Sequence, residues 1–231
     1  MLGMWLRSIL PEHHLNTETK DLVKLGVGLI GTMAALLLGL LVASAKSSYD
    51  ARSSELTQMA ANTILLDRAL AHYGPETAEV REVLKGAVNR MIAVVWGTDG
   101  KGRGIGAQTS GEILYDKIQE LSPHTDAQKT LQSQAESMAI SLGQTRWLLF
   151  EQAGSSISKP FLVVVVFWLS MLFVSFGLFA PVNATAITTL LVSAISVSGA
   201  MFLILELDAP FSGVIQISSA PLRNALTVMG R

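Results

Sequence analysis

The 231-residue sequence contains no cysteine and carries little charge of either sign. Without cysteine the chain can form no disulfide, no thiolate zinc site and no iron–sulfur cluster, and it has no cysteine nucleophile. The formal net charge is −1, so no excess of positive charge indicates a nucleic-acid partner. These absences exclude several classes of metal, redox and nucleic-acid-binding protein.

Charged residues make up 15% of the chain and hydrophobic residues 50%, whereas a soluble domain has about 25% charged residues. The deficit comes from two long uncharged stretches. Leu25 to Ala45 is 21 residues long, enough to cross roughly 30 Å of hydrocarbon once as a helix. Pro160 to Leu205 is 46 residues long and fits two crossings, with a turn where Pro181 and Asn183 break the helix.

The first stretch ends in Ala43-Ser44-Ala45, which has the small residues of a secretory cleavage site. A signal h-region has only about 7 to 15 residues, so a retained membrane span fits this stretch better. The sequence then predicts an all-α integral membrane protein with a helical cytoplasmic bundle inserted between the first and second of three transmembrane helices. The expected segments are an N-terminal interfacial segment (1–21), membrane helices (22–45, 160–180 and 184–206), the helical domain (46–159) and an amphipathic tail (207–231).

The orientation follows from the positive charges that flank the spans, because cytoplasmic loops carry more lysine and arginine. Five basic residues flank the spans on the side of the helical domain and three on the other, which predicts a cytoplasmic domain in a multi-pass protein of the inner membrane. The five are Lys46, Arg52, Arg146, Lys159 and Arg223, and the three are Arg7, Lys20 and Lys24.

Between the first two spans, apolar residues recur at helical spacing. The first helix meets no helix breaker before Gly74-Pro75, so it should continue beyond the membrane as a stalk. Further helices are expected at about 76–96, 111–121 and from Pro123 to about 153, which together predict a helical bundle. The apolar stripe of the stalk consists of Tyr49, Leu56, Met59, Thr63, Leu66, Leu70 and Tyr73.

Two short motifs raise the possibility of chemistry. The glycine-rich stretch at 97–106 lacks the Gly-Lys-Ser/Thr ending of a P-loop and follows a helix, which favours a plain loop over a nucleotide site. His13 and His14 are adjacent and lack the spacing of a helical metal site. The sequence therefore predicts no enzyme activity, no metal site and no cofactor.

The first span carries small residues on one face, and these are the candidate pore-lining residues. Small residues allow close helix packing in membranes, and a pore wall is the alternative. A bulky row formed by Leu29, Met33, Leu36 and Leu40 could instead form a dewetting constriction. The small-residue face consists of Gly28, Thr32, Ala35, Gly39 and Val42.

Four charged residues are candidates for the mouths of such a pore. Lys24 and Lys46 bracket the first span and would favour anions there. Glu206 and Asp208 end the third span. Three interpretations are open: the carboxylates mark the boundary of the span, they attract cations to a pore mouth, or they have a weak divalent-cation or gating role. A calcium site needs six or more oxygen ligands, which two carboxylates do not supply.

Three stretches resemble a known family: residues 10–50 with the entry "LPEHH", residues 157–181, and residues 203–226 with "ELDAPFSG" and "SSAPLR". They resemble the bestrophin-like bacterial membrane family, whose members are similar to bestrophin channels. The resemblance implies an oligomeric channel with a cytosolic helical domain, in which the first span here corresponds to the pore-lining helix. The resemblance also implies a span before this helix, and the ten residues ahead of Pro11 are too few to form one.

Two functions follow. The first is a homo-oligomeric channel in the lipid bilayer that conducts small inorganic ions passively through a central pore. The alternative is a non-conducting structural or signalling membrane protein whose helical domain binds a partner.

Overall fold

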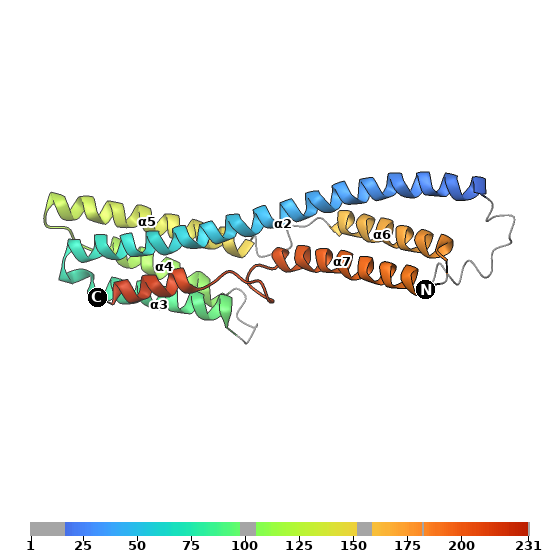
Figure 1. Cartoon of the computed structure of the whole chain (residues 1–231). Helices are drawn as coiled ribbons and strands as arrows, with labels where there is room; N and C mark the ends of the chain where they lie inside the picture. Colours follow the sequence, from blue (N-terminus) through green and yellow to red (C-terminus); the bar gives the residue numbers. More distant parts are fainter. Residues whose placement is uncertain (1–16, 98–104, 152–158, 182, 231) are drawn as a thin grey trace. The chain divides into compact units, whose positions relative to one another are not determined.

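The computed structural model describes residues 17–97, 105–151, 159–181 and 183–230. Every regular element in these ranges is helical, as the sequence predicts. The helices are α2 (Thr17–Tyr73), the 3-10 helix η2 (Pro75–Thr77), α3 (Ala78–Trp96), α4 (Ile105–Gln119), α5 (Asp126–Glu151), α6 (Lys159–Phe179), α7 (Ala184–Asp208) and α8 (Ala220–Met229) (Figure 1).

The chain divides into two compact units. The first unit contains Met1–Ser48 and Ser155–Asp208, and the second contains Tyr49–Gly154 and Ala209–Arg231. The helix α2 contributes to both units, so the helical domain is inserted between the first and second membrane helices.

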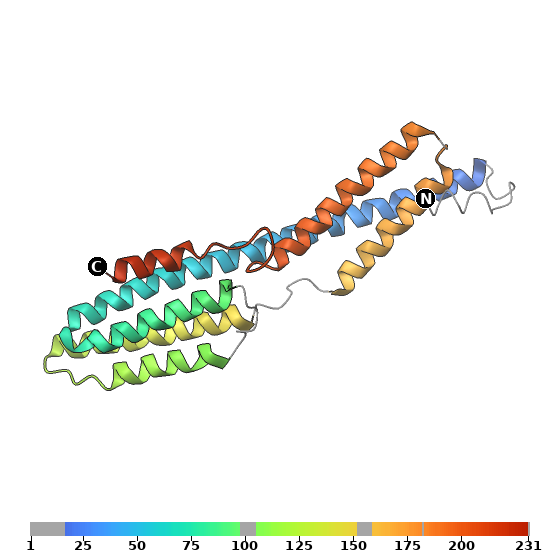
Figure 2. The same ribbon diagram turned by 90° about the horizontal axis from the view of Figure 1, so that it is seen from below.

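In the first unit, α6 and α7 lie alongside the N-terminal part of α2 (Figures 1 and 2). Three helices have the length and apolar composition needed to cross a membrane, over Glu18–Tyr73, Pro160–Phe179 and Ala184–Asp208. The turn between α6 and α7 contains Pro181, and the side-chain oxygen of Asn183 accepts a hydrogen bond from the Ala186 amide at 2.8 Å. Asn183 therefore caps α7 at the predicted break.

The second unit is a helical bundle in which the C-terminal part of α2 packs with α3, α4, α5 and α8 (Figure 2). The predicted stripe of the stalk faces its core: Leu56, Met59, Thr63, Leu66, Leu70 and Tyr73 are buried, and Tyr49 is half-buried. On α3 the buried residues are Val80, Leu84, Val88 and Met91.

The conformation of Gly74 and hydrogen bonds of the buried Thr77 side chain stabilise the turn between α2 and α3. Gly74 has a φ of +143°, a conformation that side-chain-bearing residues rarely adopt. The hydroxyl of Thr77 is buried and makes bonds of 2.6 Å with the Leu70 carbonyl and 2.8 Å with the Gly74 carbonyl. These contacts end α2 where the Gly-Pro pair predicted.

The C-terminal tail completes the same bundle. Ile217, Leu222 and Ala225 are buried in one core cluster with Leu56 and Met91, and Met229 is buried in the other. The indole nitrogen of Trp96 donates a 2.8 Å hydrogen bond to the Ile217 carbonyl, across 121 residues of sequence. The sequence predicted an amphipathic tail, and its apolar face contacts the bundle.

Candidate pore-lining surface and membrane pocket

One face of α2 packs against α6 and α7 inside the first unit. Leu41 and Ala45 of α2, Val165 of α6 and Ile204 of α7 form a buried cluster. Ala34, seven residues before Leu41 and hence on the same face, is only 1% exposed. This row, at positions 34, 41 and 45, holds the three membrane helices together.

The candidate pore-lining residues lie outside that row. Gly28, Thr32, Ala35, Gly39 and Val42 are all exposed in the chain. A Cβ atom added to Gly28 or Gly39 would meet no other atom within 4 Å, whereas one added to Gly31 would lie 3.7 Å from Leu172. The small residues therefore do not serve helix packing within the chain, and both a pore wall and contact with another copy remain compatible with their exposure.

The bulky row is exposed as well. The exposed fractions of these residues lie between 45% and 72%, for Leu29, Met33, Leu36 and Leu40. α2 thus presents two neighbouring unpacked faces, one small and one bulky. A membrane helix with two such faces can meet lipid, a second subunit and a pore.

The charged candidates are distributed over both ends of the first unit. The Lys24 ammonium lies 3.0 Å from the Asp21 carboxylate, and both side chains are largely exposed. Lys46 is exposed, while Glu206 and Asp208 are half-buried in the last turn of α7, and none of these three lacks an interaction partner. After Asp208 the chain turns, with the Ile217 amide donating to the Pro210 carbonyl at 2.7 Å.

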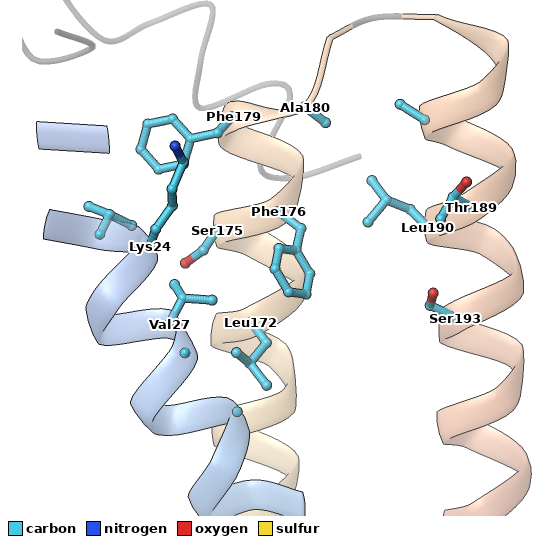
Figure 3. Close-up of a pocket in the computed structure, with 14 residues that line it drawn as sticks. Lys24, Val27, Leu172, Ser175, Phe176, Phe179, Ala180, Thr189, Leu190 and Ser193 are labelled. Carbon is cyan, nitrogen blue, oxygen red and sulfur yellow. The ribbon is translucent and has the colours of Figure 1, made fainter. Parts of the chain in front are cut away.

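A pocket of about 740 Å³ lies among α2, α6 and α7 within the first unit (Figure 3). Its lining is mainly apolar and includes Leu172, Phe176, Phe179 and Leu190. Lys24, a predicted pore-mouth residue, and Gly28, the first of the predicted pore-lining residues, also line the pocket. No sequence signal marks this pocket, because its walls come from three helices whose mutual packing is not encoded in any one of them.

Several hydroxyl groups on the membrane helices donate hydrogen bonds within their own helix. The hydroxyls of Thr189 and Ser196 donate to the carbonyls of Thr185 and Val192, each at 2.9 Å, and Thr32 of α2 does the same to Gly28 at 3.0 Å. These hydroxyls bond within their helix because the carbonyl one turn earlier is within reach of each of them.

The sequence motifs with possible chemistry fall mostly outside the described residues. His13, His14 and positions 98–104 of the glycine-rich stretch all lie there, and α4 begins directly afterwards at Ile105. Among the residues that the structure describes, no group of three or more histidine, aspartate or glutamate side chains could hold a metal ion.

The helical topology and the three apolar helices define a membrane protein with the bestrophin fold. The chain belongs to the Bestrophin-like domain family, which it matches over residues 1–222. No match was found among curated proteins.

Solved structures show the same fold at low sequence identity. The chain is similar to the crystal structures of two variants of a bacterial bestrophin homologue from Klebsiella pneumoniae. For one, the TM-score is 0.66 at 13% identity, with 100% of this chain and 97% of that chain covered. For the other, the TM-score is 0.63 at 16% identity, with 89% and 87% covered. A crystal structure described as a membrane protein gives 0.67 at 13% identity, with 100% and 97% covered.

Proposed function

We propose that copies of this chain form a homo-oligomer in the bacterial inner membrane and conduct small inorganic ions passively through a central pore lined by α2. The observation that carries the proposal is the exposure of Thr32, Ala35, Gly39 and Val42. In a single chain this small-residue face has no packing role, since Ala34, Leu41 and Ala45 supply the internal contacts. Small side chains leave room for ions along a pore axis.

In the proposed oligomer, the bulky row of α2 would contact a neighbouring subunit or lipid. Leu36 and Leu40 stand beside the small-residue face and are exposed. In an oligomer they would pack on a neighbouring subunit or on lipid, where van der Waals contact stabilises helix association. We propose a cytoplasmic location for the second unit, which the excess of basic residues that flank the spans on its side supports.

The test combines mass and flux. Full-length protein is purified in detergent, its mass is measured by size-exclusion chromatography with light scattering, and it is reconstituted into liposomes with sodium and chloride gradients. We expect a multi-subunit mass and ion flux. Gly39→Trp should abolish flux with assembly intact, while Leu205→Trp, at an exposed position of α7, should leave flux unchanged.

Two results would contradict the proposal: a single-subunit mass, or flux through the Gly39→Trp oligomer equal to that of the parent. A parent oligomer without flux would instead favour the alternative, a non-conducting membrane protein whose helical domain binds a partner.

A further inference from the structure

We propose that the pocket among α2, α6 and α7 binds an anionic phospholipid, with its phosphate on Lys24 and an acyl chain between Leu172, Phe176 and Leu190. The pocket belongs to the unit that contains the three membrane helices, so the molecules that surround it are lipids. Its volume of about 740 Å³ lies within the roughly 300–1,000 Å³ of typical ligand sites.

The polarity of the pocket matches that of a phospholipid. Among the lining residues in the described part of the chain, Lys24 carries the only charge. Its ammonium points toward Phe179, near the turn between α6 and α7, and Leu172 lies deeper between the helices (Figure 3). The pocket thus has a cation at the helix ends and an apolar interior below it. A phospholipid has the matching order, with its phosphate at one end and its acyl chains below.

The ion pair with Asp21 leaves Lys24 able to bind a phosphate. The side chains of Lys24 and Asp21 are 70% and 62% exposed, and ion pairs that exposed contribute little stability. An ammonium also has three donors, of which this contact uses one. A phosphate can therefore be bound beside Asp21 without displacing it.

Two hydroxyls supply a second polar contact below the cation. Ser175 of α6 and Ser193 of α7 both line the pocket. Within the described ranges, neither donates to the carbonyl one turn earlier, as Ser170 does at 2.7 Å and Ser196 does at 2.9 Å. Ser175 lies below Lys24 in Figure 3, where the ester carbonyls of a lipid follow its phosphate and would accept hydrogen bonds.

The experiment is native mass spectrometry of the full-length protein in detergent, titrated with phosphatidylglycerol or phosphatidylcholine. We expect the parent protein to retain phosphatidylglycerol preferentially. Lys24→Gln should weaken phosphatidylglycerol binding about fivefold, as expected for about 1 kcal/mol per basic residue, and remove the preference. Lys46→Gln, the same change outside the pocket, should keep it.

A pocket-filling variant separates this site from lipids on the outer surface. Ser175→Phe should abolish retention at the site, while Ser170→Phe, on the same helix outside the pocket, should not. Equal retention by Lys24→Gln and parent would overturn the proposal. So would competition by inorganic phosphate, which would indicate a free-anion site, or dissociation of the oligomer by Ser175→Phe with lipid retained, which would place a second copy in the pocket.

Lipid retention is measured without ion flux, so this proposal and that of a channel can fail independently.

Discussion

The guanidinium of Arg81 donates two hydrogen bonds to the carboxylate of Asp67, at 2.7 Å from Nε to Oδ1 and 3.0 Å from Nη2 to Oδ2. Asp67 is 1% exposed and Arg81 is 27% exposed. The hydrogen bond to Asp67 raises the pKa of Arg81 above its ordinary value. This pair joins α2 to α3 inside the second unit, 14 residues apart in sequence.

The unequal burial of the pair predicts unequal effects of breaking it. Arg81→Met leaves a carboxylate buried without its partner and should cost about 3–5 kcal/mol of unfolding free energy. Asp67→Asn should cost less, because the guanidinium that remains can reach water. Thermal unfolding in detergent measures both, with Glu82→Gln of the exposed Lys85 pair as the control that should change stability little. Equal losses of unfolding free energy for Arg81→Met and Asp67→Asn would contradict the prediction that burial makes the two effects unequal.

Ala34 and Ala35 provide a test of the two sides of α2. Ala34→Leu inserts volume into the packed face and should cost about 1–3 kcal/mol, seen as a lower unfolding temperature. Ala35→Leu adds the same atoms to the exposed face and should leave subunit stability unchanged while it reduces flux in liposomes. If Ala35→Leu proves the more destabilising change in a dissociated subunit, the assignment of faces is wrong.

The contact between Trp96 and the tail should anchor the C-terminus. Trp96→Phe removes the donor to the Ile217 carbonyl, keeps a ring to face Phe211, and should cost about 1 kcal/mol. Leu222→Ala should cost more, about 2–5 kcal/mol, because Leu222 is fully buried. Limited proteolysis should cut the tail faster in both variants, and unchanged cleavage would show that the tail is held elsewhere.

The carboxylates at the end of α7 give a prediction about selectivity. We expect Glu206→Gln combined with Asp208→Asn to lower the permeability to sodium relative to chloride, because negative charge at a pore mouth attracts cations. Lys46→Gln should shift the ratio the opposite way. Reversal potentials in planar bilayers measure both, and repeating them with calcium tests the divalent-cation or gating role. Identical reversal potentials in all three proteins would remove these residues from the pore mouth.

Much of the fold could be predicted from helix periodicity and helix breakers. Gly74-Pro75 and the Pro181 turn mark the ends of α2 and α6 because both local sequences are incompatible with a continuing helix. The core face of the stalk could be predicted because the opposite face of this part of α2 contacts water. Its residues are therefore mainly polar, and the apolar stripe marks the buried face. The resemblance of the sequence to bestrophin-like proteins was confirmed by the family match.

The candidate site was harder to predict for a physical reason. In lipid both faces of a helix are apolar, so no polarity contrast distinguishes the packed row at Ala34 and Leu41 from the exposed row at Ala35 and Gly39. The pocket beside Lys24 and the bond from Trp96 to Ile217 join segments far apart in the chain, and neither leaves a local signal. The roles of the predicted pore-lining and pore-mouth residues stay predictions until flux is measured.

The second unit is built from two pieces of chain that are separated by both α6 and α7. During synthesis the ribosome releases residues 49–154 first, and their core lacks Ile217, Leu222 and Ala225 until the last residues emerge. The bundle therefore cannot finish folding before α6 and α7 have been synthesised. A chain truncated ahead of residue 209 leaves the apolar surface of this core uncovered, so a complete bundle requires that both helices have been synthesised.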